Sequence, residues 1–246
     1  MVELGRLRGE AVSLLAQADL LLGLARAFGQ PGPAATKAVA DLAGVAEPLT
    51  EAAGGPDPRA LADALRLAAW SIADAEPGAL AREYERLFSC GVACPIHEAG
   101  FVRRDKGHIL GDIAGFYRAF GVQLRDGSAE RPDHLVAELE FLALLLVMLA
   151  RAEGEPAEVT RAAARAFGED HLGEWLPGFA MHLAVTTREP AYAHLAHALA
   201  GAWTAVAATL GLDEAPRRLP AAGTGAGAGT EAGEPFECGL AEAGLA

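Results

Sequence analysis

Proline and glycine divide this sequence into segments of helical length. The breaks fall at residues 29–33, 54–58, 77–78 and 154–156, and each combines the two residue types that most often end a helix. Within residues 3–28 and 79–88 the apolar side chains recur every three or four positions, which is helical spacing. Leu and Ala dominate, whereas the strand-favouring Val, Ile and Thr are sparse. We therefore predict an all-α protein.

The same pattern gives approximate boundaries for the helices. Of 246 residues, 52% are hydrophobic, which is ample for a packed core. We expect helices at residues 3–28, 34–53 with an interruption near Pro48, 59–75, 79–88, 107–120, 132–153, 157–167, 171–183 and 190–210. Residues 89–105 are expected to form the longest loop. From residue 213 the composition changes to Gly and Ala with few large apolar side chains, which predicts a flexible, mildly acidic tail over residues 213–246.

The charge balance restricts the partners that the chain can have. There are 33 acidic against 20 basic residues, a net charge of −13, which argues against nucleic acid or an anionic membrane as the main partner and favours a cationic one. No run reaches the roughly 18 apolar residues of a membrane span, and residues 1–10 do not resemble a signal peptide. Three cysteines at uneven spacing suit a reducing compartment. We expect a cytoplasmic protein without stable membrane insertion.

Residues 130–134 form a corner loaded with ionisable groups ahead of the most apolar helix. Pro132 disfavours helix for the residue before it, so Glu130, Asp133 and His134 should lie where one helix has ended and the next begins. Glu138 lies one turn further on. Two interpretations remain open. These groups either cap the helix and face solvent, or they form a cluster of acceptors for cationic groups, with His134 able to change charge near neutral pH.

A second group of polar residues lies in the loop over residues 89–105. Cys90, Cys94, His97 and Glu98 are all possible metal ligands within nine positions, so a metal-dependent helical enzyme with Glu98 as base is the alternative function. The Cys-x3-Cys spacing lacks the second ligand pair of a structural zinc site. The sequence also has no phosphate-binding loop and no nucleophile-elbow motif. We therefore predict no metal and no cofactor.

Five motifs in order give the sequence a family resemblance. They are Tyr84-Glu-Arg-Leu-Phe88, Pro95-Ile-His-Glu98, residues 115–121, Glu130-Arg-Pro-Asp-His134 with residues 138–142, and residues 171–175. Together they resemble the TorD/DmsD/NarJ-type redox enzyme maturation chaperones, with Glu-x-Pro-Asp-His as the most specific mark. The resemblance implies a cytoplasmic, non-catalytic chaperone. It would hold the precursor of a molybdenum-dependent oxidoreductase of the dimethyl sulfoxide reductase type, through its twin-arginine signal peptide or apo-catalytic subunit, until cofactor insertion and export.

The resemblance also implies an architecture and a set of binding residues. It implies a multi-helix TorD-like bundle with helical subdomains at residues 1–128 and 129–212, joined at a hinge, as a monomer or a domain-swapped homodimer. In the loop, Ile96 and His97 before the motif glutamate and Ala99 after it depart from the family pattern. The implied signal-peptide-binding residues are Tyr84, Leu87, Phe88, Pro95, Glu98, Glu130, Pro132, Asp133, His134 and Glu138.

Overall fold

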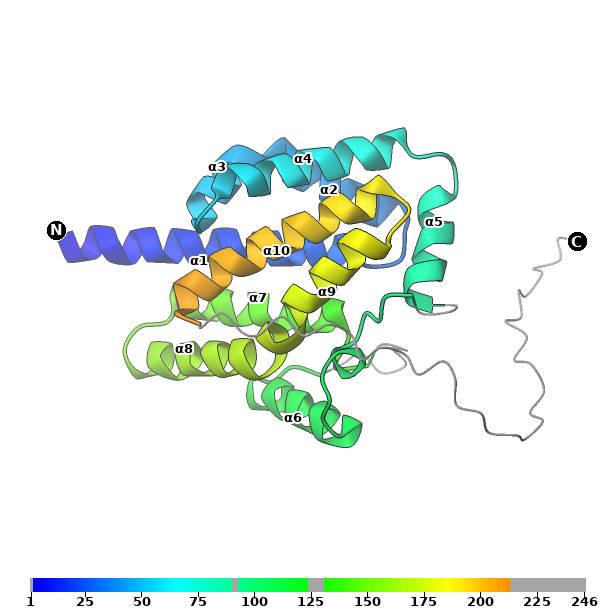
Figure 1. Cartoon of the computed structure of the whole chain (residues 1–246). Helices are drawn as coiled ribbons and strands as arrows, with labels where there is room; N and C mark the ends of the chain where they lie inside the picture. Colours follow the sequence, from blue (N-terminus) through cyan, green and yellow to red (C-terminus); the bar gives the residue numbers. More distant parts are fainter. Residues whose placement is uncertain (1, 90–92, 124–130, 213–246) are drawn as a thin grey trace, which may run out of the picture.

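The protein was analysed as a computed structural model that describes residues 2–89, 93–123 and 131–212 (Figure 1). Within these ranges the regular structure is helical, apart from one isolated antiparallel bridge between His97 and His134. The predicted all-α class is confirmed. The predicted tail at residues 213–246, and the candidate residues Cys90 and Glu130, lie outside the described residues.

The helices follow one another with short connections. Two of the short elements, η1 and η3, are π-helices, and η2 is a 3-10 helix. In chain order the elements are α1 (Val2–Ala27), α2 (Pro33–Gly44), α3 (Ala46–Ala53), α4 (Pro58–Asp74), α5 (Ala79–Tyr84), η1 (Glu85–Ser89), η2 (Glu98–Gly100), α6 (Lys106–Ala119), α7 (Leu135–Arg151), α8 (Glu155–Phe167), η3 (Gly168–Leu172), α9 (Gly173–Thr186) and α10 (Pro190–Leu210).

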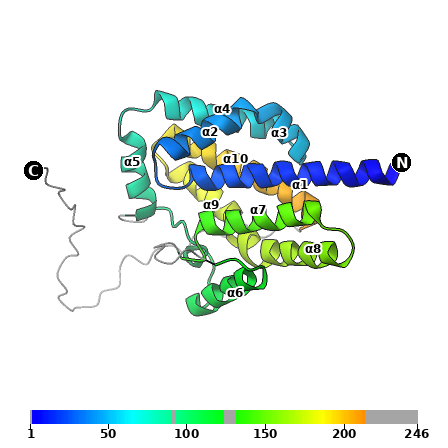
Figure 2. The same ribbon diagram turned by 180° about the vertical axis from the view of Figure 1, so that it is seen from behind.

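The long helices pack side by side around one core (Figures 1 and 2). Helix α1 lies along α7 on one side and contacts α10, α2 and α3, while α4 packs on α10 and α9 lies beside α10. The core is built from leucines of α1 and α7 and from an aromatic group in which Phe179 contacts Phe28, Phe88, Phe101 and Trp175. Helices from both halves of the chain thus share this core. The boundary near residue 129 and its hinge stay a prediction.

None of the described helices is both long enough and apolar enough to cross a membrane. The most apolar of them, α7, has 17 residues, and nine of these are buried against the rest of the bundle. Its apolar surface is therefore used inside the protein.

Several helix boundaries differ from those expected from sequence, and two of the differences have a clear physical reason. The second predicted helix breaks at Val45 rather than near Pro48, because proline is tolerated in the first turn of α3. Helix α7 begins at Leu135 rather than at Pro132. The reason is that His134 is its N-cap, with Nδ1 accepting a hydrogen bond from the Val136 N–H at 3.2 Å. Pro132 and Asp133 therefore lie in the turn before the helix.

The loop over residues 93–105 is attached to the bundle by backbone hydrogen bonds at several points. Cys94 N–H donates to the Leu87 carbonyl at 2.9 Å, and Glu98 N–H donates to the Asp133 carbonyl at 3.0 Å. Leu135 N–H donates to the Ile96 carbonyl at 3.1 Å. The loop and the corner at residues 131–134 are thus one unit, although the two residues of each of these last two hydrogen bonds lie more than 30 positions apart in the chain.

Candidate functional site

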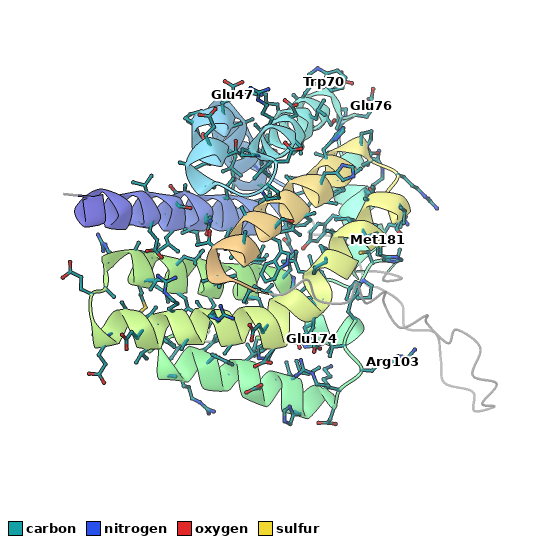
Figure 3. The ribbon with its side chains drawn as sticks, turned by 60° about the vertical axis from the view of Figure 1, so that its left-hand side comes forward. Glu47, Trp70, Glu76, Arg103, Glu174 and Met181 are labelled. Carbon is teal, nitrogen blue, oxygen red and sulfur yellow. The ribbon has the colours of Figure 1, made fainter. Side chains whose placement is uncertain are left out.

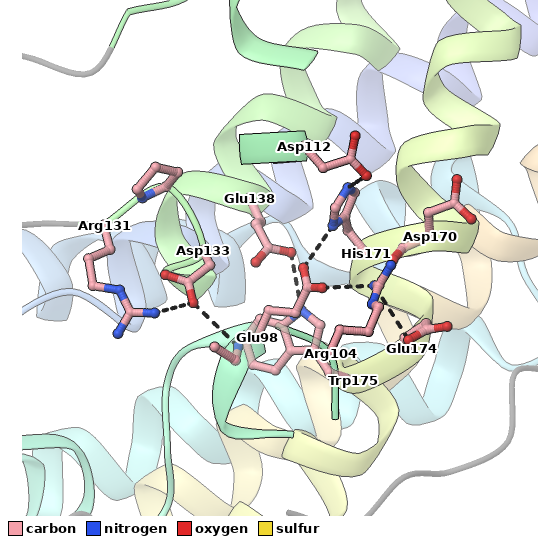
Figure 4. Close-up of polar contacts among 12 residues, drawn as sticks. Glu98, Arg104, Asp112, Arg131, Asp133, Glu138, Asp170, His171, Glu174 and Trp175 are labelled. Atoms are coloured by element: carbon pink, nitrogen blue, oxygen red, sulfur yellow. Dashed lines mark hydrogen bonds and ion pairs between the residues drawn. The ribbon is translucent and has the colours of Figure 1, made fainter. Parts of the chain in front are cut away.

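Three fully buried carboxylates form the centre of this unit. The side chains of Glu98, Asp133 and Glu138 come from the loop, the corner and the first turns of α7, and each residue has a relative exposure of 0%. Figure 4 shows them in a row, and we call them the carboxylate cluster. Burying a carboxylate is costly unless it is paired or protonated. The interpretation of the corner groups as facing solvent is therefore wrong for Asp133 and Glu138, although His134 does cap α7. The contacts of each carboxylate explain how it is accommodated.

Asp133 ties the corner to the loop. Its Oδ2 accepts a hydrogen bond from Arg131 Nη2 at 2.5 Å and another from the Ala99 N–H at 3.3 Å. Its carbonyl oxygen accepts from Glu98 N–H. Its Oδ1 is buried and, within the described part of the chain, has no hydrogen-bond partner. Asp133 thus keeps unused capacity to accept a hydrogen bond.

Glu98 uses both carboxylate oxygens. Its Oε1 accepts from Arg104 Nη2 at 3.1 Å, and its Oε2 lies 2.9 Å from Nδ1 of the fully buried His171. The same Arg104 nitrogen donates to the Asp170 carbonyl at 2.6 Å and lies 3.5 Å from Glu174 Oε2 (Figure 4). Arg104 therefore links the loop to η3 and to the start of α9.

Glu138 is the carboxylate of the cluster without a guanidinium partner among the described residues. Its Oε2 accepts a hydrogen bond from Trp175 Nε1 at 3.1 Å. Burial, reinforced by the negative charge of Glu98, raises the pKa of Glu138 well above its usual value, although the bond from Trp175 opposes this. Glu138 therefore keeps its proton at pH values where an exposed glutamate is ionised, which lowers the total charge of the cluster.

Glu138→Gln tests this protonation state. The folded chain holds the proton while the unfolded chain releases it near pH 4.5, so the stability of the wild type falls as pH rises above 4.5 towards the raised pKa. The slope is at most about 1.4 kcal/mol per pH unit. Glutamine keeps an oxygen that can accept the Trp175 hydrogen bond but does not titrate, so the variant does not lose this stability as pH rises. In urea denaturation at a series of pH values, the variant should gain stability relative to the wild type as pH rises; a constant difference would contradict the assignment.

His97 and His134 face each other where the loop crosses the corner. Their rings meet edge to face with centroids 5.0 Å apart, and their backbones form the isolated antiparallel bridge. Burial, together with the neighbouring His134, lowers the pKa of His97 to about 4, so His97 is neutral at pH 7. On the other side of the corner, Tyr117 donates its hydroxyl proton to the Pro132 carbonyl at 2.9 Å. The corner is thus fixed from two sides.

The possible metal ligands of the loop lie in different surroundings. The Cys94 thiol is fully buried, and this burial raises its pKa to about 12, which disfavours the thiolate that a metal needs. Glu98 instead binds Arg104 and His171. Across the described ranges, no group of three or more His, Cys, Asp or Glu side chains could hold a metal ion. Cys90 lies outside those ranges.

The apolar residues of the predicted site belong to the core. Leu87 has a relative exposure of 0%, and Phe88 packs against Tyr84, Phe179 and Tyr192 with ring centroids 5.1–6.3 Å apart. The structure thus brings together Glu98, Asp133, His134 and Glu138, while Tyr84, Leu87 and Phe88 pack elsewhere. A role of the aromatic group in contacting a partner stays a prediction.

Four residues of the network were not expected from sequence. They are Arg104, Arg131, His171 and Trp175. Arg104 stands in a charged run that is typical of an exposed loop, and Trp175 fits an aromatic stripe that indicates only core packing. His171 meets Glu98 across 73 positions of sequence. No local periodicity encodes such a contact.

Comparison with known proteins places this site inside a family. The family described as nitrate reductase delta subunit matches residues 51–181, which is about half of the chain and includes every residue of the carboxylate cluster. The chain belongs to this family. The resemblance to redox enzyme maturation chaperones inferred from the motifs is thereby confirmed.

Curated relatives agree with the family assignment. The chain is 45% identical over 93 residues to the selenate reductase assembly chaperone protein of Thauera selenatis, a match covering 37% of this chain and 47% of the relative. It is 44% identical over 85 residues to the chlorate reductase assembly chaperone protein of Ideonella dechloratans, covering 34% and 44%. It is also 41% identical over 68 residues to the perchlorate reductase assembly chaperone protein of Dechloromonas aromatica (strain RCB), covering 27% and 30%. Each match spans less than half of the relative.

Proposed function

We propose that this protein is a non-catalytic assembly chaperone for a molybdenum-dependent oxidoreductase of the dimethyl sulfoxide reductase type. It binds the precursor of the catalytic subunit in the cytoplasm, through the twin-arginine signal peptide or the apo-subunit, until cofactor insertion and assembly or export. The names of the three relatives, each an assembly chaperone of an oxyanion reductase, support this class of client.

One observation supports binding of arginine side chains in particular. Glu98 and Asp133 both bind guanidinium groups, those of Arg104 and Arg131, whose side chains keep relative exposures of 32% and 34%. The carboxylate cluster is therefore suited to arginine and lies close enough to the surface for an arginine head to reach it. A twin-arginine peptide offers two such heads and a short apolar run.

The charge of the chain supports the same partner. With a net charge of −13, the protein attracts a cationic segment over a distance of about one Debye length, roughly 8 Å at physiological salt. Binding should therefore weaken as salt is raised. The buried ion pairs themselves are screened less, so part of the affinity should survive.

The proposal is tested by capture from the protein's own cells. The tagged full chain is purified from cells grown so that respiratory molybdoenzymes are expressed, and the bound chains are identified by mass spectrometry. A bait carrying Asp133→Ala with His134→Ala serves as the comparison. Recovery of a twin-arginine precursor by the wild type, at much reduced yield with the double variant, supports the proposal. If no such precursor is enriched and the bound chains are the same with both baits, the proposed function is wrong.

A further inference from the structure

Glu98 and Asp133, two carboxylates of the cluster, are already bound by arginines of the same chain. Arg104 Nη2 lies 3.1 Å from Glu98 Oε1, and Arg131 Nη2 lies 2.5 Å from Asp133 Oδ2. Figure 4 shows the two guanidinium groups on opposite sides of the carboxylate row. The Asp133 carboxylate also accepts a hydrogen bond from the N–H of Ala99, the residue after Glu98. The two carboxylates are therefore held close to each other.

Both contacts are incomplete as arginine–carboxylate pairs. The strongest geometry has two parallel N–H···O bonds, whereas each arginine here reaches its carboxylate through one nitrogen, Nη2. Arg131 Nε and Asp133 Oδ1 are both buried, yet neither has a hydrogen-bond partner in the described ranges. A buried polar atom without a hydrogen bond is unfavourable, because it has lost its contact with water and gained no partner. A guanidinium that made two bonds to Asp133 would therefore have an advantage over Arg131.

We propose that Arg104 and Arg131 are internal competitors that occupy the guanidinium subsites of the client, and that client arginines bind by displacing them. This inference rests on the proposed function. Both side chains are about one third exposed, so each head can move into water without unfolding its segment. The carboxylates then stay paired before and after exchange, and the empty chaperone never holds an uncompensated buried charge.

Exchange predicts selectivity for arginine over lysine. An ammonium group that replaced Arg131 would bind as a point charge and could not form two parallel bonds to Asp133. It would thus gain little over the internal arginine that it displaces. A twin-lysine peptide of equal net charge should therefore bind more weakly than a twin-arginine peptide.

Chemical rescue tests the subsites without any client. The full chain is prepared as Arg104→Ala and as Arg131→Ala, with Arg103→Ala as the matched control, because Arg103 is exposed and its side chain extends outward from the protein (Figure 3). Loss of either cluster arginine should lower Tm by roughly 5–10 °C. Millimolar methylguanidinium should restore much of this loss, methylammonium should not, and Arg103→Ala should respond to neither. Equal responses of the variants and the control would overturn the inference.

Peptide titration tests the competition itself. Two variants should bind a twin-arginine signal peptide about tenfold more tightly than the wild type: Arg131→Ala, and Arg104→Lys, which keeps a positive charge and so protects the fold. The affinity of Arg103→Ala should equal that of the wild type. Unchanged or weaker binding by both cluster variants would overturn the exchange. Rescue by methylguanidinium together with no binding of the peptide by any variant would support the subsites and instead overturn the proposed function.

Discussion

Replacing Trp175 with alanine is expected to lower the free energy of unfolding by about 3–5 kcal/mol. The side chain is fully buried, and its ring packs against Phe101 and Phe179 with centroids 5.6 Å and 5.5 Å away. It also donates the 3.1 Å hydrogen bond to Glu138, so the variant leaves both a cavity and a buried carboxyl group that has lost this donor. Urea denaturation followed by circular dichroism measures the loss.

Trp70 provides the matched control. It is 65% exposed on α4 and extends away from the bundle in Figure 3. Trp70→Ala should change the free energy of unfolding by no more than about 0.5 kcal/mol. Similar losses for the two variants would mean that the buried contacts of Trp175 do not stabilise the fold as expected.

Asp133→Asn is expected to weaken binding of a twin-arginine signal peptide by about 30-fold or more, equivalent to about 2 kcal/mol. Asparagine keeps the size of the side chain and an oxygen for the Ala99 N–H, but removes the negative charge that a guanidinium needs. Isothermal titration at low and moderate salt gives the affinity, and Tm shows that the variant is folded.

Asp63→Asn controls for the overall loss of one negative charge. The Asp63 side chain is 68% exposed, and it lies on α4, away from the carboxylate cluster. Removing the Asp63 charge should change the affinity for the signal peptide less than twofold, and only at low salt, because exposed charges are screened. If Asp63→Asn weakened binding as much as Asp133→Asn, recognition would rest on net charge or on the surface between α4 and α10 that Asp63 lines, and not on the carboxylate cluster.

The helices could be predicted closely where glycine and proline mark their ends. Helices α1, α4, α6 and α10 begin and end within one residue of the expected positions, because each is bounded by such residues or by a capping Asp. The start predicted for α7, at Pro132, is three residues too early. Pro132 is compatible with a first helical turn, and only the contact between His134 Nδ1 and the Val136 N–H shows that the helix begins later.

The carboxylates could be found from sequence, but their surroundings could not. The motif pointed to Glu98, Asp133 and Glu138, yet nothing local distinguishes a buried acid from a solvated one. Glu98 is accommodated by Arg104 and His171, which lie 6 and 73 positions away in sequence, and Glu138 by Trp175, which lies 37 positions away. Such contacts follow from how α7, α9 and the loop pack together, which the spacing of apolar residues does not specify.

Cross-link mapping can locate the client arginines, which we propose are received by the carboxylate cluster. A twin-arginine signal peptide carrying a photoreactive residue beside the arginines is irradiated with the full chain, and the attached residues are located by mass spectrometry. We expect attachment within residues 96–104 and 131–138. Another surface to compare is the groove of about 590 Å³ between α4 and α10, lined in part by Leu67, His197 and Gly201. Attachment concentrated in that groove, with none near Glu98 or Asp133, would show that the carboxylate cluster does not bind the client arginines.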